Sequence, residues 1–278
     1  DGNMMMAPLE TMENDVDNLS GLFLNPMSQA EASKVAVYSG ADYAWNVGGF
    51  DAISSWKRAI KEITPDVNEA FERFADNMSF LDGIMPFDES RYLIDTIAEV
   101  QASLESGVGI AEAIAKAKAV FEQLSDDVVL LKGMENKVML ADVQQHLVAY
   151  ELVVEAGLAS VSALEGAISG DIKATLDAID LSQTKLVDAD KVTIKSLEGA
   201  TEKANKVNVF ERRVKPFISK LNDSSNTILM DSLFKGPNAF VTVDGQDETP
   251  AQITKGALGY EVSGVGQVSA EQHITAAL

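Results

Sequence analysis

A stretch of 129 residues without proline, between Pro86 and Pro216, places the strongest limit on the fold of this chain. Proline breaks helices because it lacks a backbone N–H and clashes with the preceding turn. Within the stretch, apolar residues recur at intervals of three and four, the period of one helix face. One stripe is Leu140, Val143, Leu147, Tyr150, Val154, Leu158, Val161 and Ile168, and a second beside it is Met134, Val138, Ala141, Val148, Leu152, Ala156 and Ala159. Two adjacent stripes predict a long helix that packs on several neighbours, as in a bundle.

Capping residues divide the helical zone. We expect Ser90 or Asp88 to cap a helix that begins near Arg91, and Asp126 to cap a later helix. Ser169-Gly170-Asp171 predicts the end of one helix and the start of the next.

Residues 185–223 continue the helical pattern, and Pro216 predicts a kink or break within it. A glycine inside a helix costs about 1 kcal/mol relative to alanine. We therefore expect the interior glycines to mark close approaches between helices: Gly133, Gly157, Gly166 and Gly199.

Composition divides the chain into four parts. Residues 1–30 are Met-rich and acidic, and we expect an extended arm there. Residues 31–92 hold most of the aromatic side chains and predict an aromatic-rich part of short helices, whereas 93–235 predict the long-helix bundle. Residues 236–278 predict a β-rich tail. The expected fold is mainly α: an elongated helical bundle with an N-terminal arm and a small C-terminal β-hairpin tail.

The tail shows strand and turn signals. Apolar and polar residues alternate around Phe240–Val243, and Asp244-Gly245 is a hairpin turn pair. A second strand is expected near Tyr260–Val262, and residues 269–278 are expected to close the chain as a short helix.

Charge and cysteine content exclude several classes of function. The net charge of −21 repels a phosphate backbone, so broad nucleic-acid binding is not expected. The chain has no cysteine, which excludes disulfides, thiolate nucleophiles and Cys-based metal sites. No uninterrupted apolar run approaches ~18 residues, so no membrane span is predicted.

Histidine is the scarcest catalytic residue type, with only His146 and His273. His146 lies beside an apolar stripe and is interpreted as a packed structural residue. A Ser-His-Asp triad would need one of the two, and no G-x-S-x-G motif precedes a serine.

Acidic residues are plentiful but form no recognisable metal loop. Asp15 and Asp17 begin like a calcium loop, but Leu19 stands where the next oxygen ligand belongs. The turn at Asp244–Glu248 clusters three carboxylates and leaves weak ion binding open. With 43 acids, carboxylate pairs at glycosidase spacing arise by chance.

Two SGVG sequences, Ser106–Gly109 and Ser263–Gly266, lack the third glycine of a dinucleotide fingerprint and are interpreted as caps or turns. The sequence thus assigns no catalytic, cofactor-binding or metal-binding residue and no cofactor.

The Ala-rich helices, the acidity, the missing cysteine and a first residue, Asp1, that is not methionine together resemble the internal head (core or inner-body) proteins of large tailed bacteriophages. In that family a protease cuts after glutamate in short motifs. Similar motifs stand at Ser103-Leu104-Glu105, Ser196-Leu197-Glu198 and Ser269-Ala270-Glu271. The resemblance implies proteolytic processing, location in the virion or in the host cytoplasm during assembly, and no residue-level site.

The resulting hypothesis is a non-enzymatic structural protein of a virion that acts through contacts with other virion or assembly proteins, as a homo-oligomer. One alternative is a secreted α-helical toxin or adhesin. A second alternative is a carboxylate-dependent hydrolase, which would require a cleft lined by acidic side chains.

Overall fold

The computed structural model describes residues 2–16, 20–78, 88–198 and 201–234, and beyond them only the backbone of five short strands. The helices are α1 (Ala30–Trp45), α2 (Ala52–Ile63), α3 (Asn68–Asp76), α4 (Ile94–Ser106), α5 (Ile110–Gly133), α6 (Lys137–Ser169), α7 (Ile172–Lys191) and α8 (Val214–Phe234), with 3-10 turns η1 (Val47–Gly49) and η2 (Arg91–Leu93). The strands are β1 (Thr193–Glu198), β2 (Thr201–Lys206), β3 (Phe240–Val243), β4 (Gln246–Pro250), β5 (Gln252–Gly256), β6 (Gly259–Ser263) and β7 (Ile274–Ala277). The mainly α prediction is confirmed.

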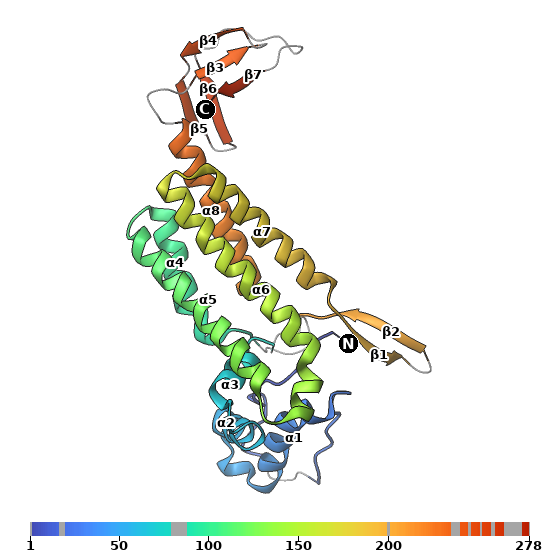
Figure 1. The fold of residues 1–278 in the computed structure, drawn as a ribbon. Helices are drawn as coiled ribbons and strands as arrows, with labels where there is room; N and C mark the ends of the chain where they lie inside the picture. The colour runs from blue at the N-terminus through green and yellow to red at the C-terminus, as the bar shows by residue number, and fades with distance from the viewer. Residues whose placement is uncertain are drawn as a thin grey trace.

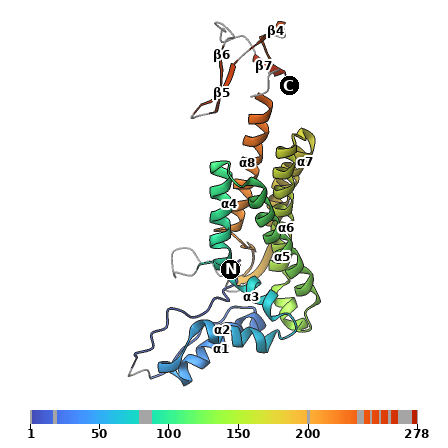
Figure 2. The same ribbon diagram turned by 90° about the vertical axis from the view of Figure 1, so that its left-hand side faces the viewer.

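The helices form an elongated molecule (Figure 1). Helices α4 to α8 run side by side as a bundle, and α1 to α3 gather at one end of it. Strands β3 to β7 lie beyond the other end, past the end of α8, while the β1–β2 hairpin projects from the side (Figures 1 and 2).

Helix α6 is the centre of the core because it packs against α5, α7 and α8. Both predicted stripes contribute buried residues, including Val143, Leu147 and Tyr150 from the first and Ala156 from the second. By length and composition α6 would also suffice to cross a membrane, but 67% of its most apolar stretch is buried within the protein. A helix that is apolar on nearly all sides is what the middle of a bundle requires.

Two glycines of α6 mark close approaches, as predicted. A Cβ at Gly157 would lie 2.0 Å from the Phe121 ring of α5, and one at Gly166 would lie 2.8 Å from the Thr175 hydroxyl of α7. At Gly133 nothing lies within 4 Å, so that part of the prediction is wrong. Gly199 lies outside the described residues.

The expected helix over 185–223 is interrupted. After α7, β1 and β2 form an antiparallel hairpin that pairs Thr193 with Lys206. The β-branched Val192, Thr193 and Ile194 favour extended chain, and the Val207 N–H donates to the Val192 carbonyl at 2.9 Å to close the base. Pro216 neither kinks nor breaks a helix, because it lies in the first turn of α8, where its missing N–H leaves no intrahelical bond unmade.

Two of the predicted caps are wrong. Asp126 lies inside α5, which continues past it without a break. Ser90 precedes η2 but makes no side-chain capping bond, and Asp88 accepts the Glu89 N–H rather than one at the start of η2 or α4. Asp76 instead accepts the Arg91 N–H at 2.7 Å. The third prediction is confirmed, since α6 ends at Ser169, Gly170 has φ 76°, and the Asp171 carboxylate accepts the Ala174 N–H.

The tail is β-structured where it is described. β3 pairs antiparallel with both β4 and β7, and β5 pairs with β6. The expected turn at Asp244-Gly245 lies outside the described residues. The expected terminal helix is wrong over 274–277, because these residues form β7, with β-branched Ile274 and Thr275 opposite β3.

Candidate functional site

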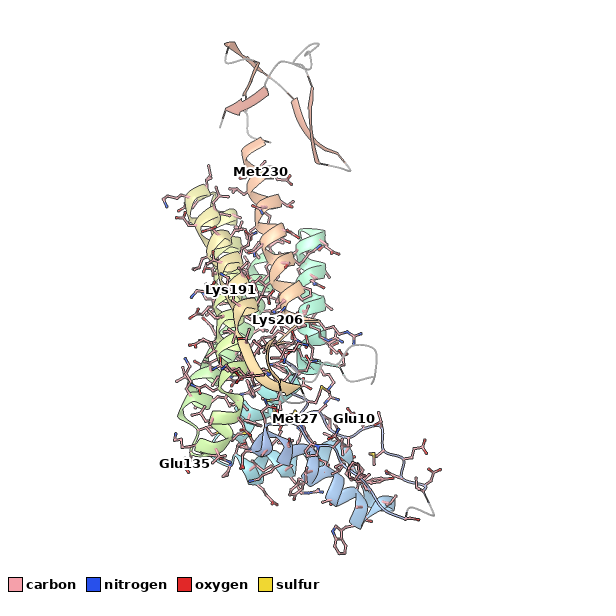
Figure 3. The ribbon with its side chains drawn as sticks, turned by 90° about the vertical axis from the view of Figure 1, so that its right-hand side faces the viewer. Glu10, Met27, Glu135, Lys191, Lys206 and Met230 are labelled. Atoms are coloured by element: carbon pink, nitrogen blue, oxygen red, sulfur yellow. The ribbon has the colours of Figure 1, made fainter. Side chains whose placement is uncertain are left out.

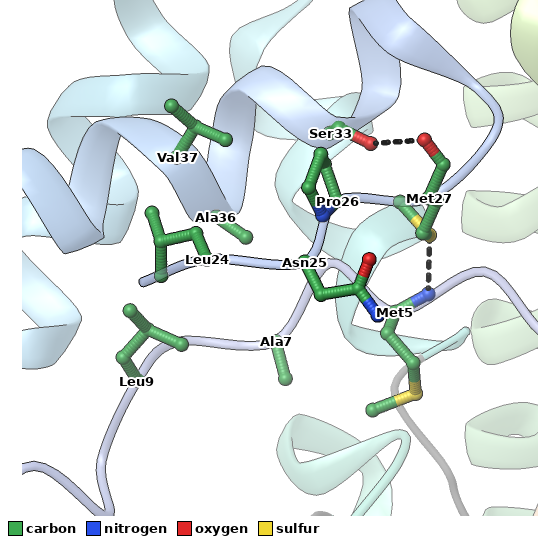
Figure 4. A pocket seen from close by; sticks show the side chains of 10 residues that line it. All are labelled: Met5, Ala7, Leu9, Leu24, Asn25, Pro26, Met27, Ser33, Ala36 and Val37. Atoms are coloured by element: carbon green, nitrogen blue, oxygen red, sulfur yellow. Dashed lines mark hydrogen bonds between the residues drawn. The ribbon is translucent and has the colours of Figure 1, made fainter. Parts of the chain in front are cut away.

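Two extended segments lie against the helices: residues 2–9, the first extended segment, and residues 20–27, the second. The first begins at the base of the β1–β2 hairpin, where Gly2 meets Lys206, and its end lies with the second beside α1 (Figures 3 and 4). Neither forms a strand ladder in the described part of the chain. Side chains of the first segment alternate as in a strand. Met4 and Met6 are fully buried in the core, whereas Met5, Ala7 and Leu9 face a pocket.

This pocket lies between the two segments and α1 (Figure 4). It has a volume of about 210 Å³ and is lined by Met5, Ala7, Leu9, Leu24, Asn25, Pro26, Met27, Ser33, Ala36 and Val37. The Ser33 hydroxyl is occupied, because it donates to the Gln29 carbonyl at 2.8 Å. The Asn25 amide is the other polar side chain in the lining. Such a pocket can hold an apolar group beside one amide, but its lining offers no acid or base.

Backbone atoms of the first extended segment bind two neighbouring elements. The Trp56 Nε1–H of α2 donates to the Met6 carbonyl at 2.5 Å. The Met5 N–H donates to the Met27 sulfur at 3.2 Å, which joins the two segments (Figure 4). The pocket-lining face of the segment is therefore fixed relative to α2 and to the second segment.

A second, charged cleft of about 430 Å³ lies where α2, α3 and η2 meet. It is lined by Ile53, Trp56, Lys57, Glu72, Arg73, Asp76, Arg91 and Tyr92. Its carboxylates are already paired: Glu72 with Lys57 at 2.7 Å, and Asp76 with Arg91 at 3.0 Å. The cleft is lined by acidic side chains, as the hydrolase alternative requires, but both of these carboxylates already form ion pairs within the protein.

Asp76 is nearly buried and serves as a cap. It accepts the Arg91 N–H and Nε–H, while Arg91 also reaches Glu10 at 2.6 Å. Burial raises the pKa of Asp76 despite the opposing effect of the Arg91 guanidinium. The carboxylate thus joins α3, η2 and the residues that follow the first extended segment.

Asp127 of α5 is fully buried and accepts two hydrogen bonds of 2.7 Å from the Arg73 guanidinium. Gln123 Nε2 donates to the same carboxylate at 3.2 Å. Bidentate pairs of this kind fix orientation as well as charge, so this pair fixes α3 on α5.

An amide and two phenols lie beside the cleft. The Asn77 side-chain amide donates to the hydroxyls of Tyr92 at 2.9 Å and Tyr150 at 2.8 Å. Burial raises the pKa of Tyr92 and of Tyr150, so both remain neutral at physiological pH.

Glu89 is a third buried carboxylate, 2% exposed. It accepts the backbone N–H groups of Arg212 at 2.5 Å and Arg213 at 3.1 Å, just before α8. Burial raises the pKa of Glu89 to about 7, and these two hydrogen bonds oppose the rise. A helix start favours an anion, so Glu89 acts as a cap supplied from a distant loop.

Only one of the two histidines, His146, lies in the described residues. His146 is 1% exposed on α6, and its Nε2–H donates to the Gly2 carbonyl at 3.0 Å. Burial lowers the pKa of His146. His273 lies outside the described residues.

The remaining sequence candidates form no site in the described residues. Asp15 is exposed, and Asp17 and Leu19 lie outside that range. Of the Asp244–Glu248 turn, only the backbone of 246–248 is described, in β4. Ser106–Gly109 forms the turn between α4 and α5, with positive φ at Gly107 and Gly109, as predicted; Ser263–Gly266 is described only at Ser263. Among the described residues no group of three His, Asp or Glu could hold a metal ion.

Sequence reasoning missed both the pocket and the charged cleft. A signal for the pocket existed, because MMMAPL alternates between buried and pocket-facing side chains. The cleft joins residues from separate helices, such as Glu72 and Arg91, and no spacing rule brings these together.

A family model described as beta-N-acetylglucosaminidase matches residues 1–76, which include every residue lining the apolar pocket. Three solved structures share the fold. CpGH84D has a TM-score of 0.74 and 22% identity, covering 81% of this chain and 38% of that one. CpGH84B has a TM-score of 0.67 and 26% identity, covering 79% and 37%. A mutant O-GlcNAc hydrolase of Thermobaculum terrenum has a TM-score of 0.70 and 17% identity, covering 83% and 47%.

This chain therefore spans less than half the length of each of these three structures. The likeness extends well beyond residues 1–76, because it covers about four fifths of the chain and so includes most of the bundle.

These findings correct the sequence-based interpretation. The resemblance to bacteriophage head proteins is wrong, because the matches are to a beta-N-acetylglucosaminidase model and an O-GlcNAc hydrolase. The predictions that depended on this resemblance are wrong as well. These are the non-enzymatic virion function, the proteolytic processing and the location in a virion or host cytoplasm. The second alternative, a hydrolase, fits better. Acidity and lack of cysteine are shared by many classes of protein, so they did not discriminate between these two.

Proposed function

We propose that this chain is part of a glycoside hydrolase that removes β-linked N-acetylglucosamine. The observation that carries the proposal is the match of residues 1–76 to the beta-N-acetylglucosaminidase model. This range contains both extended segments and their apolar pocket. The likeness of four fifths of the chain to a Thermobaculum terrenum O-GlcNAc hydrolase supports the same assignment for the bundle.

In this proposal, the three buried carboxylates Asp76, Glu89 and Asp127 stabilise the structure and do not react with the substrate. Glycoside hydrolysis requires two carboxyl groups on either side of the scissile bond, one of them a proton donor. Asp76, Glu89 and Asp127 are instead held by arginine side chains or by backbone N–H groups. We therefore assign the reacting carboxyl groups to residues other than these three.

We infer that the two extended segments face the sugar-binding region, because both lie within the residues that match the family model. Neither segment belongs to a strand ladder in the described range. Their backbone N–H and C=O groups that make no other hydrogen bond can pair with a neighbouring strand. Phe23 of the second segment is 92% exposed and Trp45 at the end of α1 is 90% exposed, which is unusual for large aromatic side chains. We infer that these segments and aromatic residues meet further structure of the enzyme.

The test is hydrolysis of a chromogenic aryl N-acetyl-β-glucosaminide by the natural protein that contains these 278 residues. The matched control substrate is the aryl β-glucoside, which differs only at the 2-position. A site that hydrogen-bonds the acetamido group should prefer the first substrate by about 10⁴-fold in kcat/KM. Absence of turnover, or equal rates on both glycosides, would overturn the proposal.

A further inference from the structure

The carbonyl of Gly2 accepts two hydrogen bonds from parts of the chain more than 140 residues away. The His146 Nε2–H of α6 donates at 3.0 Å, and the backbone N–H of Asn208, in the linker before α8, also donates at 3.0 Å. Next to them the Asn208 side-chain amide donates to the Asn3 Oδ1 at 2.8 Å. We call these three hydrogen bonds together the Gly2 anchor.

The Gly2 anchor leaves no room for a side chain at position 2. A Cβ on Gly2 would lie 1.6 Å from the Lys206 carbonyl oxygen, a distance at which the backbone must move. Because Lys206 ends β2, the first extended segment is pressed against the base of the hairpin. This close approach is possible only for glycine.

The anchor sets which side chains of the first extended segment point inward. Two residues after Gly2, Met4 enters the core, and Met6 follows it, both fully buried. Their neighbours Met5 and Ala7 face the apolar pocket. In extended chain a shift of one residue exchanges the two faces, so a fixed Gly2 keeps the pocket lined by Met5 and Ala7 rather than by Met4 and Met6.

His146 is suited to this role because its ring has no other partner in the described structure. Its Nδ1 is buried and makes no hydrogen bond to any described residue. The ring is 1% exposed and neutral, since burial lowers its pKa. A leucine would fill this position in a helix core equally well, so packing alone does not explain a histidine.

We propose that His146 is a positioning residue that, through the Gly2 anchor, fixes the register of the first extended segment and so the lining of the apolar pocket. The anchor couples α6 and the linker before α8 to a segment of the region matched by the family model. Its effect on hydrolysis rests on the proposed function, whereas the anchor itself does not.

The test is amide hydrogen exchange by mass spectrometry in His146→Leu, His146→Gln and wild-type protein. The leucine variant keeps the volume and removes the donor, whereas the glutamine Nε2–H occupies a similar place and should restore the bond. Amides of residues 3–9 should exchange about 10-fold faster in His146→Leu, as expected for loss of one buried hydrogen bond. In His146→Gln they should stay within about 3-fold of wild type.

Gln145→Leu is the matched control, because Gln145 is the preceding residue of α6 and is exposed. It should leave exchange in residues 3–9 unchanged. Equal exchange of these amides in His146→Leu and wild type would overturn the proposal. An equal rise along α6 and residues 3–9 would also overturn it, because it would make His146 an ordinary core residue.

Asn208→Ala and Asn3→Ala keep the test decisive if His146→Leu folds poorly. Both residues are partly exposed, and either change removes the side-chain bond while keeping the Asn208 backbone donor. Exchange of residues 3–9 should rise about 3-fold in each, and no rise in either would count against the anchor.

A kinetic readout separates the anchor from the proposed function. With the aryl N-acetyl-β-glucosaminide, His146→Leu should lower kcat/KM about 10-fold or more, since small misplacements near a reacting centre are costly, and His146→Gln should recover most of the loss. If wild type does not hydrolyse the substrate, the proposed function fails and the exchange experiment still decides the anchor. A third outcome is that wild type is active, both variants have the same kcat/KM as wild type, and exchange of residues 3–9 still rises in His146→Leu. The anchor then exists but does not position the pocket, and the positioning role of His146 is rejected.

Discussion

The ring of Phe121 in α5 lies directly over Gly157 of α6, so close that a Cβ at position 157 would be 2.0 Å from Phe121 Cε1. Phe121 is fully buried and stacks on Phe217 of α8 at 6.0 Å between ring centroids. One glycine thus allows three helices to meet at a single aromatic pair, and this contact sets the spacing of α5, α6 and α8.

Gly157→Ala should therefore destabilise the protein. The added methyl group must displace the Phe121 ring, and overpacking of this kind costs about 1–3 kcal/mol. Gly133→Ala is the matched control, because it also lies in a helix but nothing is within 4 Å of its Cβ position. That change should be neutral or stabilise by up to about 1 kcal/mol. Chemical denaturation gives the free energy of unfolding of both variants. Equal changes in the two would contradict the close approach of the Phe121 ring to Gly157.

Arg73→Met should lower the free energy of unfolding more than the loss of a surface ion pair does. Asp127 would remain as a buried charge without its guanidinium partner, which costs about 3–5 kcal/mol. Lys173→Met is the control, since Lys173 and Asp177 form an exposed ion pair along α7, and loss of such a surface pair should change the stability little. The free energy of unfolding is measured for both variants. Similar losses in the two would show that the Arg73 guanidinium does not hold Asp127 as a buried ion pair.

Glu89 should make the protein less stable as the pH rises. Its pKa is about 7 in the folded state, against an ordinary value of 4.5 for a glutamate, so between these values the folded protein binds more protons than the unfolded chain. The free energy of unfolding should then fall from pH 4.5 to 7, by about 3 kcal/mol from this group alone. His146 acts oppositely, because its lowered pKa gives stability that is present above 6.5 and lost as the pH falls.

Glu89→Gln isolates the Glu89 contribution, because His146 is unchanged in both proteins. The difference in free energy of unfolding between variant and wild type should move in favour of the variant as the pH rises from 4.5 to 7, and level off above 7. Glu165→Gln, at an exposed residue paired with Lys118, should show no such trend. A difference for Glu89→Gln that is flat with pH would contradict the buried, partly protonated carboxyl group.

The long helices could be predicted because their signal is local. The stripes of α6 repeat every three to four residues, and Asp171 caps α7 from three residues away. The β1–β2 hairpin was missed because Lys195, Glu202 and Ala204 suit helices, while its stability depends on pairing across the turn.

The sites were less predictable because they join distant parts of the chain. Arg73 and Asp127 are 54 residues apart and Glu89 and Arg212 are 123 apart, so no sequence window contains either pair. The Gly2 anchor spans 144 residues between Gly2 and His146. The proposed glycosidase function could not be predicted from composition, because acidity and helix content follow from solubility and packing rather than from chemistry.

The central claim is that Asp76, Glu89 and Asp127 stabilise the structure of an N-acetylglucosaminidase and do not react with its substrate. Its most direct test is to measure the activity and the melting temperature of Asp76→Asn in the intact natural protein. Loss of the charge that holds Arg91 should lower the melting temperature by several degrees. At temperatures where the variant is folded, kcat on an aryl N-acetyl-β-glucosaminide should stay within about 10-fold of wild type. An unchanged melting temperature with kcat reduced by about 10⁴-fold would contradict the account and make Asp76 a reacting group.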